Sequence, residues 1–179
     1  MKKFIVKTKS LRMLADTVTP VSIYLKIRDI NPNSLLLESS DYHGNENSFS
    51  YICFTPLASF EADYSTVTET WPDGSKTTTK LTEKNSFNLR LSSFIGSFLT
   101  SDITGDIPVN GLFGYTSYDA VEYFEKIKFR SREPDPHKIP DVLYNLYKYI
   151  IAVNHFQNVL QIFENQINEG PGEIERIVT

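Results

Sequence analysis

A segment rich in tyrosine, leucine and isoleucine, residues 142–154, constrains the fold more than any other part of the sequence. Such a composition is typical of a long β-strand. Asn158 is a turn residue that follows this segment, and the apolar residues in 159–163 predict a second strand. Two strands joined by a short turn pair in antiparallel fashion. The sequence therefore predicts a sheet built around this hairpin.

Further strands are predicted where apolar residues alternate with polar ones, or where apolar runs are short. These segments are 21–28, 35–37, 49–54, 58–70, 77–81 and 109–118. The turn Pro72-Asp73-Gly74-Ser75 joins two threonine-rich segments into a long hairpin. Its polar character indicates a hairpin that faces solvent.

Helices are predicted for residues 9–17, 86–100 and 120–129. The clearest is 86–100, where apolar residues recur at intervals of three and four and form one stripe. The helix at 9–17 is expected to end at Thr19-Pro20, because proline cannot donate to the helical hydrogen bonds. The predicted class is α+β, a mainly antiparallel sheet or sandwich with a few helices packed on it.

The composition is that of a soluble globular domain. The chain has 179 residues, 40% of them hydrophobic, and a formal net charge of -4, so no basic excess favours nucleic acid or an anionic membrane. The single cysteine, Cys53, excludes an intrachain disulfide and fits a reducing compartment. No apolar run approaches the ~20 residues of a membrane helix. We therefore expect a cytoplasmic protein that binds neither nucleic acid nor membrane.

Residues that could carry catalysis or hold a metal are few. His43, His137 and His155 lack the i, i+4 spacing of metal-binding helices. Cys53 lies in an apolar stretch, and Glu122 and Glu125 have the i, i+3 spacing of a solvated helix face. Nucleophile-elbow and phosphate-loop motifs are absent from the sequence. No catalytic residue, metal ligand or cofactor is predicted in this chain.

Four short motifs, taken in order, resemble the N-terminal region of the large subunit of anthranilate synthase, a chorismate-utilising enzyme. They are Thr19-Pro20-Val21, residues 35–40 (LLLESS) followed by 48–52 (SFSYI), residues 111–119 (GLFGYTSYD), and Pro140-Asp141 with the strand that reaches Asn154-His155. The resemblance covers roughly residues 9–166. Two departures stand out: residues 41–50 carry no basic residue, and Asn154 replaces an aspartate, which we interpret as a structural substitution at a strand end or turn.

The resemblance implies that residues 1–168 form an N-terminal, regulatory-type domain. Residues 169–179 would be a linker or the start of a C-terminal chorismate-binding domain that this sequence does not include. The whole enzyme would convert chorismate and glutamine-derived ammonia into anthranilate and pyruvate, the first step of tryptophan biosynthesis, with Mg²⁺ in the missing catalytic domain. This chain would be inactive alone. Its partners would be the amidotransferase subunit, its own C-terminal domain and the feedback inhibitor L-tryptophan.

The resemblance further places part of the tryptophan site at Leu37, Glu38, Ser39 and Ser40. A zwitterionic amino acid needs an acceptor for its ammonium, donors for its carboxylate and an apolar slot for its side chain. Glu38 would be the acceptor, and the hydroxyls of Ser39 and Ser40 the donors; Ser39 aligns with the family's inhibitor-contacting serine. The slot would be walled by Leu36, Leu37 or Phe49. Residue chemistry alone favours a plain strand end, in which Glu38 pairs with a cation and the serines cap a turn; the resemblance is what favours the inhibitor site.

Two other functions remain open from sequence. One is the large subunit of aminodeoxychorismate synthase, a folate-pathway relative of the same architecture. The Glu38-Ser39 pair after the leucines favours the tryptophan enzyme over it. The other is a stand-alone binding module unrelated to chorismate.

Overall fold

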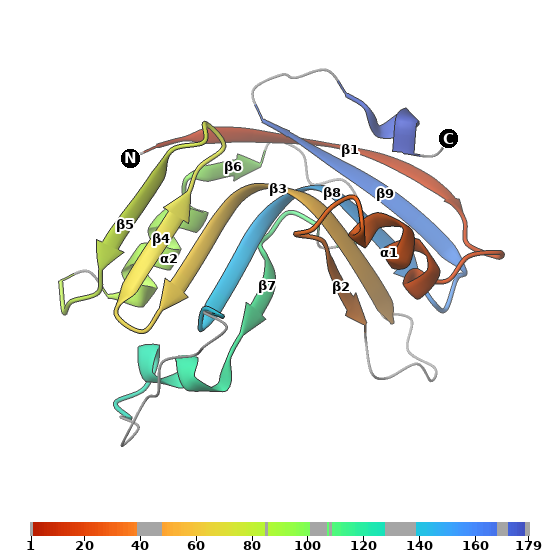
Figure 1. The fold of residues 1–179 in the computed structure, drawn as a ribbon. Coiled ribbons are helices and arrows are strands. Elements are labelled where there is room, and N and C mark those ends of the chain that lie inside the picture. The colour runs from red at the N-terminus through yellow and green to blue at the C-terminus, as the bar shows by residue number, and fades with distance from the viewer. Residues whose placement is uncertain are drawn as a thin grey trace. The chain divides into compact units, whose positions relative to one another are not determined.

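The computed structural model describes residues 2–38, 48–84, 86–100, 107, 109–127, 139–167 and 172–177. Within these ranges, nine strands form a mostly antiparallel sheet accompanied by two α-helices and two 3-10 helices (Figure 1). The elements are β1 (Phe4–Leu14), α1 (Pro20–Arg28), β2 (Leu35–Glu38), β3 (Phe49–Asp63), β4 (Thr66–Thr70), β5 (Lys76–Lys80), α2 (Phe87–Ile95), β6 (Phe98–Thr100), β7 (Phe113–Thr116), η1 (Tyr118–Tyr123), β8 (Val142–Asn154), β9 (Val159–Ile167) and η2 (Ile174–Ile177). The predicted α+β class is confirmed.

The chain divides into two compact units. One contains Leu57–Phe98 and Leu112–Leu146; the other contains Phe4–Pro56, Leu99–Gly111 and Tyr147–Thr179. Strands β3 and β8 each contribute residues to both units. None of the helices in the described ranges is long and apolar enough to cross a membrane.

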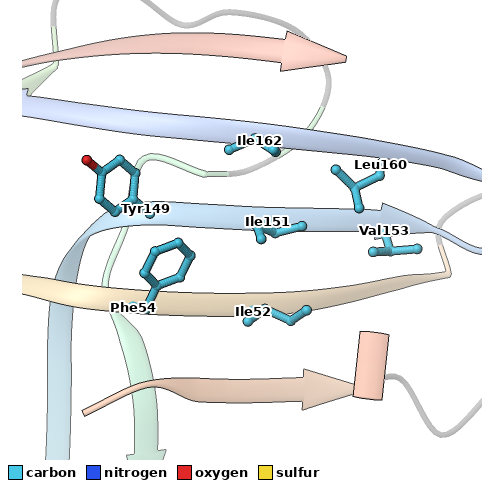
Figure 2. Close-up of a cluster of buried hydrophobic side chains, with 7 residues drawn as sticks. All are labelled: Ile52, Phe54, Tyr149, Ile151, Val153, Leu160 and Ile162. Carbon is cyan, nitrogen blue, oxygen red and sulfur yellow. The ribbon is translucent and has the colours of Figure 1, made fainter. Parts of the chain in front are cut away.

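The second unit holds a core on one face of its strands. Strand β9 pairs antiparallel with β1 and with the second half of β8, and β2 pairs with the start of β3. Figure 2 shows the buried cluster, made of Ile52, Phe54, Tyr149, Ile151, Val153, Leu160 and Ile162. Helix α1 covers this cluster with Ile23, Tyr24 and Ile27. Each fully buried side chain of this kind stabilises the fold by roughly 1.5–3 kcal/mol.

The first unit packs α2 against a strand through aromatic side chains. Strand β4 pairs with the end of β3 and with β5, and β7 pairs with the start of β8. Phe87 and Phe94 are the buried residues of α2, and their rings lie 5.6 and 5.5 Å from the ring of Phe60 on β3. The Trp71 ring lies 5.0 Å from that of Phe94. Aromatic contacts therefore hold α2 in place.

The predictions for the first thirty residues were wrong in both elements. Residues 9–17, predicted helical, lie mostly in β1, because nine consecutive rungs to β9 outweigh the local spacing of Leu11 and Leu14. Residues 21–28, predicted as a strand, form α1. Its alternating apolar residues include Ile23 and Ile27, which lie one turn apart and share a helical face. Strand pairing determined the structure of the first segment, and packing on one helical face determined that of the second.

Thr19-Pro20 begins a helix, and its interpretation as a helix stop was wrong. The Thr19 hydroxyl accepts the N–H of Ser22 at 3.1 Å, and the Thr19 N–H donates to the Ser22 hydroxyl at 3.1 Å. Pro20 is the first helical residue, where its missing N–H has no helical acceptor in any case. This reciprocal cap defines the start of α1.

Other predicted elements changed in length. Helix α2 ends at Ile95, and the last part of the predicted helix is β6. Residues 120–129, predicted as a helix, contain only η1 among their described residues. The predicted strand at 109–118 is reduced to β7, and the segments 49–54 and 58–70 merge into β3 and then turn into β4. Glycine and proline content predicts loops at 41–47 and 130–140; of these residues, only 139 and 140 are among those that the structure describes.

The two predicted hairpins are present. Asn158, with φ 52, lies in the turn between β8 and β9, and Gly74, with φ 78, lies in the turn between β4 and β5. The expectation that the threonine-rich hairpin faces solvent holds for β5 only, because Val67 and Glu69 of β4 are buried. Threonine-rich segments are compatible with either location, and β4 is in contact with α2, whose Arg90 pairs with the buried Glu69.

Candidate functional site

The predicted site lies at the end of β2. Leu37 and Glu38 are its last two residues, half-buried and exposed respectively, whereas Ser39 and Ser40 lie outside the described residues. In the antiparallel ladder with β3, Leu37 is opposite Tyr51 and Glu38 is opposite Ser50. The two described site residues are therefore tied to the first residues of β3.

Strand geometry separates the predicted residues by face. Successive side chains of a strand point to opposite faces, and directly opposed residues share a face. Glu38 thus shares a face with Leu36 and Ser50, and Leu36 packs against the buried cluster. Leu37 lies on the other face, opposite Tyr51. Of the predicted apolar walls, Leu36 is the one that lies on the face of Glu38.

A hydrogen-bonded pair that sequence reasoning missed lies on the face of Glu38. The Oγ of Ser50, which is fully buried, is 2.7 Å from the Nε2 of His155. The backbone N–H of His155 donates to the carbonyl oxygen of Ser48 at 3.0 Å. His155 therefore joins the residue after β8 to the start of β3. No local pattern indicates this pair, because its members are 105 residues apart.

The residue before His155 fixes the turn. The Oδ1 of Asn154 accepts the backbone N–H groups of Phe156 and Gln157 at 3.0 and 2.9 Å. This is the local capping for which asparagine and aspartate are both suited. The Asn154 side chain therefore has a structural role at the turn after β8.

Burial governs the ionisable groups on the neighbouring part of β3. It raises the pKa of the Cys53 thiol to about 12 and, as the main cause, raises the pKa of Tyr51. A thiol this buried and this weakly acidic is no nucleophile at neutral pH. Cys53 is a small apolar residue of the core, as its sequence context predicts. In the ranges that the structure describes, no group of three or more histidine, cysteine or acidic residues is placed to hold a metal.

The glycine-rich motif at 111–119 has a structural role at Gly114. A Cβ at this position would lie 1.8 Å from the backbone oxygen of Leu143, across the β7–β8 ladder. At Gly111, a Cβ would meet nothing within 4 Å. The glycine at 114 thus permits close approach of two strands, which is a structural role.

The first unit carries an open groove that contains none of the predicted site residues. Its volume is about 840 Å³, and its lining includes Tyr64, Leu81, Tyr123 and Lys126. The neighbouring Asp141 carboxylate accepts the Tyr123 hydroxyl at 2.7 Å and the Tyr64 N–H at 3.0 Å. This carboxylate therefore holds the turn after β3 to η1.

Comparison with known proteins agrees with the sequence motifs. No protein-family model matches the chain. It is 36% identical over 136 residues to "Anthranilate synthase component 1" of Pseudomonas putida, covering 73% of this chain and 26% of that protein. It is 28% identical over 151 residues to the Thermus thermophilus protein of that name, covering 83% and 30%. With the Pseudomonas aeruginosa protein of that name it shares 29% over 180 residues, covering 94% and 35%.

The class of protein follows from this coverage: the chain is similar to one portion of a larger synthase. It spans 26 to 35% of the length of these three relatives. Within that class, the chain resembles part of anthranilate synthase component 1, which confirms the resemblance identified from its motifs.

Proposed function

We propose that this chain is the regulatory part of an anthranilate synthase and that the end of β2 takes part in binding L-tryptophan as a feedback inhibitor. The observation that carries the proposal is the similarity, over most of the chain, to relatives named anthranilate synthase component 1. In this proposal residues 1–168 are the regulatory domain and 169–179 lead towards a chorismate-binding domain. That domain would hold Mg²⁺ and make anthranilate in the cytoplasm, with ammonia from an amidotransferase subunit.

The geometry at the end of β2 supports an amino-acid site. Glu38 is exposed at a strand end, where its carboxylate can accept the ligand ammonium. Leu36 lies on the same face, half-buried against the cluster, and its exposed part would contact the indole. Ser39 and Ser40 follow directly in sequence and would bind the carboxylate. Leu37 would line the opposite face of the same strand end.

Inhibition assays on the enzyme that contains this chain test the proposal. Glu38→Ala and Ser39→Phe should each raise the tryptophan concentration for half-inhibition. A hydrogen bond to a charged group contributes ~1.5–3 kcal/mol, and ~1.4 kcal/mol is already tenfold in affinity. The matched control is Glu61→Ala, an exposed carboxylate of β3 in the other unit. If both site variants remain as sensitive to tryptophan as the control, the site assignment is wrong.

The same preparation separates the tryptophan enzyme from its folate-pathway relative. Incubation with chorismate, Mg²⁺ and ammonium should yield anthranilate, which is followed by its fluorescence. Formation of aminodeoxychorismate would assign the chain to aminodeoxychorismate synthase. Binding of tryptophan without either product would instead favour a binding module.

A further inference from the structure

We propose that His155 is a positioning residue of the inhibitor site: it holds the β3 residues opposite Glu38 and so sets the direction of the Glu38 carboxylate. The inference rests on the proposed function, because it assigns a role within the same site. Neither the sequence motifs nor the names of the relatives assign a role to His155.

Two hydrogen bonds from one residue fix the start of β3. The Nε2 of His155 is 2.7 Å from the Oγ of Ser50, and the N–H of His155 donates to the oxygen of Ser48 at 3.0 Å. These two partners flank Phe49, the first residue of β3. One bond engages a side chain and the other the backbone, so together they restrict both the position and the rotation of this strand end.

Ser50 connects these bonds to the proposed ligand site. It is directly opposite Glu38 in the ladder, and directly opposed Cβ atoms lie roughly 4.5–5.5 Å apart on the same face. Ser50 is fully buried, whereas Glu38 is exposed. The Ser50 hydroxyl thus stabilises the rung that carries Glu38, and the exposed Glu38 carboxylate is the group that contacts a ligand. A shift of Ser50 moves the rung that carries Glu38.

His155 is itself held at a fixed point. It follows the last rung between β8 and β9, which pairs Asn154 with Val159. The Asn154 side chain then ties down the next two N–H groups, those of Phe156 and Gln157. The imidazole therefore projects from a turn with fixed geometry, as a positioning residue requires.

Two conservative variants separate the hydrogen bond from the volume of the ring. A glutamine side chain presents an amide that can replace the bond of Nε2 to a hydroxyl, whereas leucine fills space without a polar atom. His155→Gln should therefore retain tryptophan inhibition, and His155→Leu should weaken it. Ser50→Ala removes the same bond from the other side without adding volume. It serves as the second probe if His155→Leu does not fold.

The experiment is a double-mutant cycle on the enzyme that contains this chain. The tryptophan concentration for half-inhibition is measured for His155→Leu, His155→Gln, Ser50→Ala and Glu38→Ala, and for His155→Leu combined with Glu38→Ala. Each rate is expressed as a fraction of that variant's own rate without tryptophan. Residues that act through one another are non-additive, so His155→Leu should raise this concentration about tenfold alone and less than about twofold when Glu38 is already alanine.

Each outcome decides one point. If His155→Leu and Ser50→Ala leave inhibition unchanged while Glu38→Ala weakens it, the positioning role is wrong and the proposed function stands. If His155→Leu has its full effect in the Glu38→Ala background, or if glutamine behaves like leucine, His155 acts only on general stability and the inference is overturned. If Glu38→Ala itself has no effect, the proposed site fails, and this inference fails with it.

Discussion

The backbone N–H of Glu173 donates to both carboxylate oxygens of Glu164, at 3.1 and 3.0 Å. The N–H of Ile174 donates to the same carboxylate at 3.1 Å, and the Nζ of Lys148 is 3.8 Å from it. Glu164 is fully buried on β9, and Ile174 packs against the buried cluster. The start of η2 is therefore tied to the core twice, by the buried Glu164 carboxylate and by the packing of Ile174.

Replacing Glu164 with glutamine should release the segment at 172–177. The amide oxygen is a weaker acceptor than the carboxylate, and hydrogen bonds to charged groups contribute more than neutral ones, ~1.5–3 kcal/mol each. We expect faster hydrogen exchange at the amides of Glu173 and Ile174 and a lower free energy of unfolding in urea. Glu175→Gln changes an exposed carboxylate of η2 and is the control. Unchanged protection of both amides in Glu164→Gln would contradict this role.

Replacing Arg90 with methionine should destabilise the first unit in a pH-dependent way. The Nη2 of Arg90 on α2 is 2.5 Å from the Oε2 of Glu69 on β4, and the Glu69 side chain is 3% exposed. Burial raises the pKa of Glu69 from its ordinary value, and the charge and hydrogen bond of Arg90 limit that rise. Without Arg90, a buried carboxylate is left uncompensated, which typically costs ~3–5 kcal/mol.

The sign of the pH effect follows from the raised pKa of Glu69. The folded state binds the proton of the Glu69 carboxyl group more tightly than the unfolded chain does. The stability that this proton contributes is therefore present below the unfolded pKa and is lost as the pH rises through the folded pKa. Arg90→Met raises the pKa of Glu69 further. Its deficit in unfolding free energy should therefore be largest at neutral pH and shrink as Glu69 becomes protonated. In the combined variant Glu69→Leu with Arg90→Met, this pH dependence should disappear; its persistence would exclude Glu69 as the titrating group.

The elements that could be predicted from sequence are those whose local pattern admits one structure. The segment at 142–154 is apolar on both faces of a strand, and β8 has the same bounds. In α1, by contrast, the apolar residues fit both periods: Val21, Ile23 and Leu25 alternate, whereas Ile23 and Ile27 are one helical turn apart. Only the cap formed by Thr19 and Ser22 distinguishes a helix from a strand in this segment. Such a cap favours a helix only where the helix can pack on a sheet.

The candidate site could be predicted only where it is contiguous in sequence. Glu38 was placed by a short motif after an apolar run, and the structure places it at the end of a strand. The contact of His155 with Ser50 could not be predicted from sequence, because it depends on how β3 and β8 are brought together. Such long-range pairs leave no local spacing to detect.

Removing the Thr19 hydroxyl should destabilise α1. Thr19→Ala eliminates the acceptor of the Ser22 N–H, and loss of such a cap typically costs ~0.5–2 kcal/mol. Helix α1 covers the buried cluster with Ile23 and Ile27, so fraying at its start should be visible as a lower urea midpoint and as faster amide exchange in its first turn. Thr17→Ala, an exposed threonine outside the cap, is the control. Equal midpoints for the two variants would show that the cap adds nothing.

The two glycines of the 111–119 motif should respond oppositely to alanine. At Gly114 the new Cβ would lie 1.8 Å from the oxygen of Leu143 and 2.8 Å from its carbonyl carbon. Both are backbone atoms and cannot rotate away, so β7 must move off β8 at the rung that pairs Gly114 with Tyr144. Overpacking of this kind typically costs ~1–3 kcal/mol, occasionally more. Gly114→Ala should therefore lower the free energy of unfolding and speed amide exchange in β7.

At Gly111 the Cβ enters open space, and alanine reduces the freedom of the unfolded chain, so stability should stay level or rise by up to about 1 kcal/mol. Equal effects of the two substitutions in urea unfolding would mean that close approach of β7 and β8 does not explain the glycine at 114.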